Sequence, residues 1–162
     1  TTSQFTIIKL GILVLNMILI AHRGNVCGAD PQRENQPDYI ELALSQGYDA
    51  EIDIWLIDGC LWLGHDCAVY PIDALWLEQH KQHLWIHCKN IAALEALSFS
   101  NLHYFWHERD TVTLTSKGYI WAFPGNQPIA NSIAVMPEIH KETALTECAG
   151  ICSDNIEYYK YL

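Results

Sequence analysis

The sequence predicts an α/β protein built around a parallel sheet, and two patterns support this prediction. Short apolar runs rich in β-branched and aromatic residues alternate along the chain with amphipathic runs of helical length. Most of the short runs are apolar at nearly every position, as strands are when both faces of a sheet are covered. The repeated order of strand and helix favours right-handed crossovers, in either an open sheet or a (βα) barrel.

The expected elements follow one another along the whole chain. Seven short runs are expected to form strands, at residues 17–22, 49–55, 84–89, 102–107, 119–123, 132–136 and 150–153. Four longer runs are expected to form helices, at residues 38–46, 72–81, 90–99 and 138–147. Asn90 is placed to cap the start of the third helix, and Gly47 follows the end of the first. Three connecting segments are expected to be loops without helices, at residues 67–71, 110–118 and 124–131.

Composition limits the class of protein. The chain of 162 residues is half apolar, which predicts one globular domain with a substantial core. We place this domain at residues 17–162 and treat residues 1–16 as an N-terminal extension, since Met17 is a candidate start. The net charge of −10, with nine scattered Lys and Arg residues, argues against a nucleic-acid partner. The six cysteines are irregularly spaced and are expected to be reduced.

An apolar run covers residues 5–20. Lys9 and Asn16 interrupt it, and it is shorter than the ~20 residues that a membrane-spanning helix requires. No small-residue cleavage site separates the run from the first expected strand, which disfavours a secretory signal. We therefore expect a cytoplasmic protein with any membrane contact confined to residues 5–20, and the sequence predicts no particular oligomeric state.

Two carboxylates share one face of the second expected strand. Glu51 and Asp53 are two residues apart, so they point to the same side, while Ile52 and Ile54 point to the other. Two adjacent carboxylates in an apolar strand repel each other unless a cation lies between them, and loss of either charge is then expected to stabilise the metal-free protein. The alternative is an edge strand whose carboxylates are solvated.

Histidine and cationic side chains stand at the ends of the neighbouring strands. His22 ends the first expected strand, and His65 follows the second after a short turn. Two histidines flanking a carboxylate pair are the groups that acid-base catalysis beside a divalent metal ion requires. Arg23 offers a fixed pair of donors suited to a phosphate. Lys89 lies two residues after His87 in an apolar strand, so it either extends to solvent or pairs with the carboxylates or a phosphate.

Five short motifs stand in a fixed order between residues 20 and 66. They are His22-Arg23-Gly24, Glu34-Asn35, Glu51-x-Asp53, Asp58-Gly59 and His65-Asp66. This order resembles the N-terminal motif of the glycerophosphodiester phosphodiesterase family. Lys89 resembles the lysine on the third strand of that family, and the Ser-Asp within residues 150–155 resembles the end of its last strand.

The resemblance implies a phospholipase C-like phosphodiesterase barrel. Because such barrels typically need about 250 residues, the expected fold is a compact, shortened (βα)8 TIM-type barrel with several helices reduced to loops. The resemblance also implies a divalent metal ion, Mg²⁺, Ca²⁺ or Mn²⁺, on Glu51 and Asp53. His87 stands where the family has a third acidic ligand, and an imidazole there favours Mn²⁺, Co²⁺ or Zn²⁺. The alternative is that another carboxylate, such as Glu108, completes the ligand set.

The same resemblance implies a reaction in lipid metabolism. His22 and His65 would be the acid-base pair, and Arg23 and Lys89 would hold the substrate phosphate. The expected activity is metal-dependent hydrolysis of a glycerophosphodiester or a similar small phosphodiester. A non-catalytic domain that binds phosphorylated small molecules is the alternative, because shortening removes substrate-binding loops.

Overall fold

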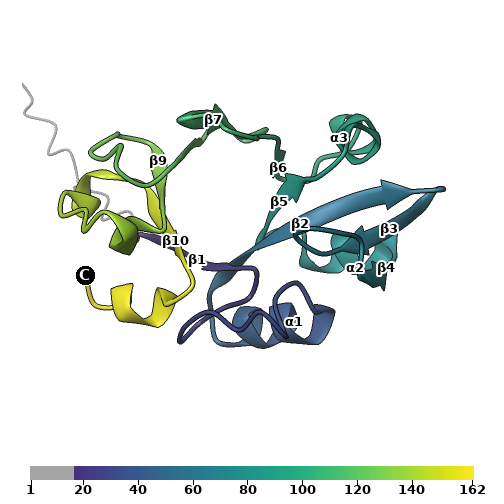
Figure 1. Cartoon of the computed structure of the whole chain (residues 1–162), viewed down its shortest axis with the longest axis horizontal. Helices are drawn as coiled ribbons and strands as arrows, with labels where there is room; N and C mark the ends of the chain where they lie inside the picture. The colour runs from purple at the N-terminus through teal and green to yellow at the C-terminus, as the bar shows by residue number, and fades with distance from the viewer. Residues whose placement is uncertain (1–16) are drawn as a thin grey trace, which may run out of the picture.

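The computed structural model describes residues 17–162, so the predicted extension at residues 1–16 lies outside the described part of the chain. Residues 17–162 form one mixed sheet of ten strands that curls into a half-barrel (Figure 1). Seven of these strands run parallel, in the order β6-β5-β2-β1-β10-β9-β8. Their bounds are Tyr104–Phe105 for β6, Leu84–Cys88 for β5, Asp49–Ile57 for β2, Ile18–His22 for β1, Gly150–Ser153 for β10, Ser132–Val135 for β9 and Ile120–Ala122 for β8.

All seven predicted strands are confirmed: six of the predicted runs contain a parallel strand, and the run at 49–55 lies within β2, which continues to Ile57. Three further strands lie antiparallel to their neighbours: β3 (Cys60–Leu63) beside β2, β4 (Tyr70–Ile72) beside β3, and β7 (Val112–Leu114) beside β8. The segments at 67–71 and 110–118 contain no helix, as predicted, but they are not only loops, because β4 begins in the first and β7 lies in the second. β4 and β7 have three residues each, which is too short to show a strand period in the sequence.

Three of the four predicted helices are confirmed, as α1 (Pro37–Ser45), α2 (Ala74–His80) and α3 (Ile91–Ser98). The Asn90 side chain accepts a hydrogen bond from the amide of Ala93, and so caps α3. Gly47 follows the end of α1 with a φ of +89°, which glycine adopts without strain.

The predicted helix at 138–147 is wrong. Two 3-10 turns, η1 (Pro137–Ile139) and η2 (Leu145–Glu147), stand in its place. The side chain of Glu142 accepts hydrogen bonds from the backbone amides of Gly125 and Gln127 at 2.8 and 2.9 Å. This tertiary contact ties the segment to the loop after β8 and overrides its helical pattern.

The prediction of a shortened (βα)8 TIM-type barrel is also wrong. Within residues 17–162, α-helices occur only in the connections that lead to β2, β5 and β6, and β7 breaks the parallel order. The connection from β8 to β9 covers only residues 123–131 and contains two prolines and a glycine, so a helical crossover, which needs about a dozen residues or more, does not fit there. Helices therefore cover only one part of the curled sheet (Figure 1).

Two buried layers lie on opposite faces of the sheet. Ile52 and Ile54 of β2 pack with Ile40 of α1 and Leu97 of α3 on the face that the helices cover. The inner face of the curl holds a second cluster, formed by Ile20, Trp85, Phe105, Trp121, Ile133, Val135 and Cys152. Polar side chains follow these apolar ones two positions later along several strands, so they share the inner face near the strand ends.

The described helices are short. The longest, α1, has nine residues, and none of the helices within residues 17–162 can cross a bilayer, which requires ~20 apolar residues. The six cysteines are free thiols, and Cys88, Cys148 and Cys152 are buried.

We expect stability to fall as the pH drops, partly because of His103. This imidazole is buried against Trp85, with ring centroids 4.0 Å apart, and forms a hydrogen bond with Thr115 Oγ1. Burial lowers the pKa of His103 to about 4, from its ordinary value near 6.5. Between these values only the unfolded state binds the proton, so the free energy of unfolding should decrease by about 1–3 kcal/mol from pH 6.5 to 4.

Urea unfolding of the wild type and of His103→Gln at both pH values tests this. The variant should lose less stability than the wild type over the same pH interval. Equal losses would show that the pKa of His103 does not differ between the folded and unfolded states.

Candidate functional site

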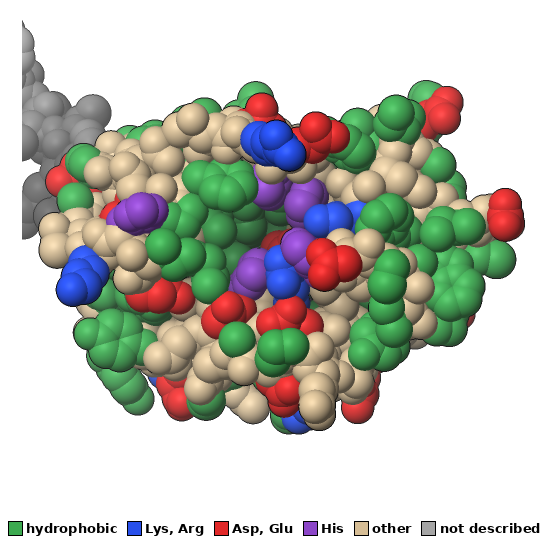
Figure 2. Space-filling model, viewed as in Figure 1, with side chains coloured by type: hydrophobic (Ala, Val, Ile, Leu, Met, Phe, Trp, Pro, Cys, Tyr) green, Lys and Arg blue, Asp and Glu red, His purple; other side chains and the backbone are tan. Residues whose placement is uncertain are grey.

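A cleft of about 750 Å³ opens at the carboxyl ends of the parallel strands. Figure 2 shows it as a hollow with histidine and cationic side chains on one side and apolar side chains on the other. All seven site residues predicted from the sequence line this cleft: His22, Arg23, Glu51, Asp53, His65, His87 and Lys89. The ends of parallel strands are where such sites form in α/β proteins, because the connecting loops leave the edge accessible.

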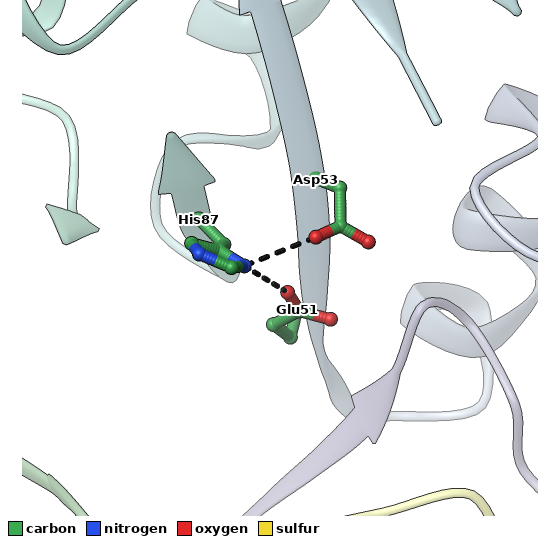
Figure 3. Close-up of side chains that lie close together, drawn as sticks. All are labelled: Glu51, Asp53 and His87. Atoms are coloured by element: carbon green, nitrogen blue, oxygen red, sulfur yellow. Dashed lines mark hydrogen bonds and ion pairs between the residues drawn. The ribbon is translucent and has the colours of Figure 1, made fainter. Parts of the chain in front are cut away.

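The two carboxylates and one imidazole lie side by side in the cleft. β2 is flanked by β1 and β5, so the alternative of a solvated edge strand for Glu51 and Asp53 is wrong. The strand register places Asp53 opposite His87, and His87 Nδ1 lies 3.0 Å from Asp53 Oδ1 and 4.0 Å from Glu51 Oε1 (Figure 3). One ligand atom from each of the three residues lies within 4.8 Å of the others, and all three residues are buried.

Two cations and the side-chain amide of Asn35 surround the carboxylate of Asp53. Arg23 Nε lies 3.2 Å from Oδ2 and Lys89 Nζ lies 3.4 Å from Oδ1. Asn35 Nδ2 donates to Oδ2 at 2.9 Å, and Asn35 Oδ1 accepts from the backbone amide of Asp53. Burial alone would raise the pKa of Asp53, but the hydrogen bond from His87 and the nearby cations outweigh it and hold the pKa well below its usual range. Asp53 is therefore an ionised carboxylate with its charge compensated.

Glu51 has a different environment, although it is only two residues away. Its Oε2 accepts a hydrogen bond from the backbone amide of Arg23 at 3.2 Å, and His22 Nε2 lies 3.9 Å from the same oxygen. Burial, followed by the charge of Asp53, raises the pKa of Glu51. From the sequence the two carboxylates look equivalent. In the structure, the negative charge of Asp53 is balanced by nearby cations, whereas that of Glu51 is not.

The turn after β1 explains why Arg23 reaches the carboxylates. Arg23 and Gly24 both have positive φ angles, of 53° and 87°. A Cβ atom on Gly24 would lie 3.0 Å from Ile40 Cδ1, so glycine fits both the backbone angle and the space. The guanidinium then lies between two acidic partners, with NH1 donating to Glu34 Oε2 at 3.0 Å and Nε facing Asp53. Glu34 therefore helps to fix the position of Arg23.

His22 has a carboxylate partner directly after β10. Its Nδ1 lies 2.7 Å from Asp154 Oδ1, and Asn25 Nδ2 donates to the same oxygen. Burial would lower the pKa of His22, but the hydrogen bond with Asp154 and the charge of Glu51 outweigh it and raise the pKa. The Ser-Asp ending of the last strand is visible in the sequence, but no role for Asp154 was predicted from it. Only the pairing of β1 with β10 shows that the two residues meet.

His65 reaches the cleft through the hairpin of β2 and β3. Asp58 and Gly59 have φ angles of 50° and 77°, as a tight hairpin turn requires. The amide of Gly64 donates to the carbonyl oxygen of Asp53 at 3.1 Å, which returns the chain to the site. His65 Nδ1 lies 2.7 Å from Asp66 Oδ1. Burial, followed by the positive charges around it, lowers the pKa of His65 despite the charge of Asp53.

His107 is a further residue of the site that the sequence analysis missed. Its ring stacks on that of His87 with centroids 4.4 Å apart and an interplanar angle of 8°. His87 Nε2 donates to the carbonyl oxygen of His107 at 3.2 Å. Glu108, the alternative ligand, lines the cleft but is not part of the cluster formed by Glu51, Asp53 and His87. In an extended segment residues 105 and 107 share one face, and this alternation is the signal that could have indicated His107.

No protein-family model, curated protein or solved structure matches this chain.

The Glu51, Asp53 and His87 cluster could hold a metal ion. The hydrogen bond from His87 Nε2 to the His107 carbonyl fixes one ring nitrogen as a donor and leaves Nδ1 facing the carboxylates. Two carboxylates and one imidazole form a donor set that suits borderline divalent cations. The cations that already surround Asp53 would compete with such an ion for its oxygens.

Proposed function

We propose that this protein is a metal-dependent phosphodiesterase that hydrolyses a glycerophosphodiester or a similar small phosphodiester. One observation supports this proposal most strongly. Two histidines, each with a carboxylate on Nδ1, line one cleft together with two cations and a buried carboxylate pair. A carboxylate on Nδ1 fixes the ring and leaves Nε2 available for proton transfer.

Two cations are placed to hold the phosphate. Arg23 presents several donors in a planar arrangement, and Lys89 presents a compact charge on the neighbouring side of Asp53. Both side chains are held by acidic partners, so they need little rearrangement when an anion binds. The net charge of the chain is −10, so binding of an anionic phosphate would depend on these two cations together with a bound divalent ion.

The histidines divide the proton transfers between them. His65 accepts the proton of the attacking water, whose oxygen forms the new bond to phosphorus. His22 donates a proton to the oxygen of the leaving alcohol as the bond from phosphorus to that oxygen breaks. The products are a phosphate monoester and an alcohol. The raised pKa of His22 and the lowered pKa of His65 agree with this division, since they favour a protonated donor and a neutral acceptor.

A divalent ion would be held by Glu51, Asp53 and His87. When bound, it would stabilise the negative charge that develops on the phosphoryl oxygens. Asp53 would then bind the ion as well as pair with Arg23 and Lys89. The hydrogen bond from Asn35 holds the Asp53 carboxylate in position.

Hydrolysis of bis(p-nitrophenyl) phosphate tests the proposal. We expect turnover in Mn²⁺, loss of turnover in excess EDTA, and recovery when the ion is restored. Absence of turnover across a panel of divalent ions would contradict catalysis. If phosphate esters still bind in calorimetry under those conditions, the protein is instead a binding domain for phosphorylated small molecules.

The identity of the ion should depend on His87. Because imidazole is a better ligand for Mn²⁺ and Co²⁺ than for Ca²⁺, we expect Mn²⁺ to stabilise the wild type more than Ca²⁺ does. An ion at 100 times its Kd adds about 2.7 kcal/mol to the free energy of unfolding, which is easily seen as a rise in Tm. In His87→Glu the order should shift towards Ca²⁺ and Mg²⁺. An unchanged order of ions would remove His87 from the ligand set.

A further inference from the structure

The wall of the cleft opposite the charged residues is mostly apolar, although His140 also lines it next to Gly125. It is formed by the ends of β8 and β9 and by η1, and Figure 2 shows its apolar side chains beside the histidines. We call the following residues the apolar wall: Trp121, Phe123, Pro124, Val135, Met136 and Ile139. A polar group placed against such a surface loses its hydration without gaining a partner, so this wall suits an apolar ligand group.

The apolar wall begins close to the charged cluster. The ring of His107 stacks on His87 and meets Phe123 edge to face, with centroids 4.7 Å apart. A single ring therefore separates the carboxylate cluster from the apolar wall. A ligand whose phosphate lies at Arg23 and Lys89 can place an adjoining apolar group directly on the wall, because all these residues line the same cleft.

The inner end of the wall is packed into the core. Trp121 is almost fully buried, and its ring packs on Phe105 with centroids 4.5 Å apart and on Trp85 at 5.9 Å. A preformed surface binds an apolar group without the entropic cost of ordering side chains. Ile139, in contrast, is 59% exposed at the rim of the cleft, so the apolar surface continues from the core to the solvent.

Met136 provides an independent observation. Its backbone has a φ of 46° and a ψ of 51°, a left-handed conformation that costs a residue with a Cβ atom about 1–2 kcal/mol. The amide of Met136 donates to the carbonyl oxygen of Cys152 at 2.7 Å, which extends the pairing of β9 with β10. The conformation thus occurs in a residue whose side chain lines the cleft, where methionine provides a flexible and polarisable apolar contact.

From these observations we infer that the substrate is a single-chain amphiphile, in which one ester group of the phosphodiester carries an alkyl chain that lies on the apolar wall. This inference depends on the proposed function, because it places the phosphate at Arg23 and Lys89. It goes further by naming the class of substrate: a monomeric phosphodiester with an apolar tail rather than a fully polar headgroup diester.

A series of alkyl p-nitrophenyl phosphates tests the inference, with methyl, butyl and octyl esters kept below their critical micelle concentrations. We expect kcat/KM to rise about twofold per methylene group, which corresponds to half of the free energy of complete burial. The octyl ester should then exceed the methyl ester by about 10²-fold. Equal values for the three esters, or a gain seen only above the critical micelle concentration, would overturn the inference.

Two variants test whether the alkyl chain lies on the apolar wall. Ile139→Ser and Met136→Gly should each lower the ratio of octyl to methyl kcat/KM by about threefold or more. The Tm of each variant shows whether it is folded, because Met136→Gly relieves left-handed strain but also loses the packing of Met136 on the core. Ile91→Ser is the matched control, because Ile91 is also exposed but lies on α3 outside the cleft. If neither variant lowers the ratio of octyl to methyl kcat/KM, the alkyl chain does not lie on the apolar wall and the inference is contradicted.

Binding measurements separate failure of the inference from failure of the proposed function. Calorimetric titration with methyl-, butyl- and octylphosphonate reports on the apolar wall even if no ester is hydrolysed. Affinity that rises with chain length in an inactive protein would support the wall and refute catalysis. Affinity that does not change with chain length, in a protein that hydrolyses all three esters equally, would refute the wall and support catalysis.

Discussion

Replacing His22 with alanine is expected to lower kcat for bis(p-nitrophenyl) phosphate by about 10²-fold or more, as loss of a positioned acid-base group does. The imidazole lies at the carboxyl end of β1, with Asp154 on Nδ1 and the cleft on its other side. The fold should survive, because Asn25 still donates to Asp154 in the variant. Steady-state kinetics with saturating Mn²⁺, together with the Tm of each protein, provide the measurement.

His83→Ala is the matched control for this variant. His83 also pairs with a carboxylate, Asp49, but it is exposed and lies outside the cleft. Its loss should leave kcat unchanged. Activity close to that of the wild type in His22→Ala would remove His22 from the mechanism, and an equal loss in both variants would indicate a general structural effect.

Asp154→Asn addresses positioning rather than proton transfer. An asparagine keeps the shape of the side chain but offers His22 a weaker, uncharged partner. We therefore expect a smaller loss of kcat than in His22→Ala, together with a lower pKa for the group that His22 contributes to the pH profile. No change in that profile would show that Asp154 serves only the fold.

Local patterns in the sequence predicted the strands and the residues at their ends. The parallel strands were recognisable because they are apolar at nearly every position, and the period of two placed Glu51 and Asp53 on one face. The burial of Glu51 and Asp53 depends on the strands beside β2, which cannot be identified from the sequence alone. Only the register of β2 with β5 shows that His87 stands opposite Asp53.

The global form of the sheet could not be predicted in the same way. The helical pattern of residues 138–147 is overridden by one long-range contact, in which Glu142 binds the amides of Gly125 and Gln127. The antiparallel strands β4 and β7 are too short to have a period. Asp154 and His107 were missed for a related reason, because each becomes part of the site only through a partner on another strand.

In the absence of metal, substitutions of Glu51 and Asp53 should change the free energy of unfolding in opposite directions. In EDTA at pH 7, Asp53→Asn is expected to lower the free energy of unfolding by about 3–5 kcal/mol, because Arg23, Lys89 and His87 then face a neutral amide in a buried site. Glu51→Gln is expected to raise it by about 1 kcal/mol, because burial and Asp53 disfavour the charge of Glu51. Urea unfolding measures both.

The dependence on pH distinguishes these causes from simple changes in packing. The lowered pKa of Asp53 means that its contribution to stability is present above its ordinary pKa near 3.8 and is lost as the pH falls below that value. The raised pKa of Glu51 means that its charge becomes unfavourable as the pH rises above about 4.5, so the advantage of Glu51→Gln should disappear near pH 4. Each variant is the control for the other, since both remove one buried charge from the same face of β2. Stabilisation of both would mean that repulsion between the carboxylates dominates, and that Arg23 and Lys89 do not compensate Asp53.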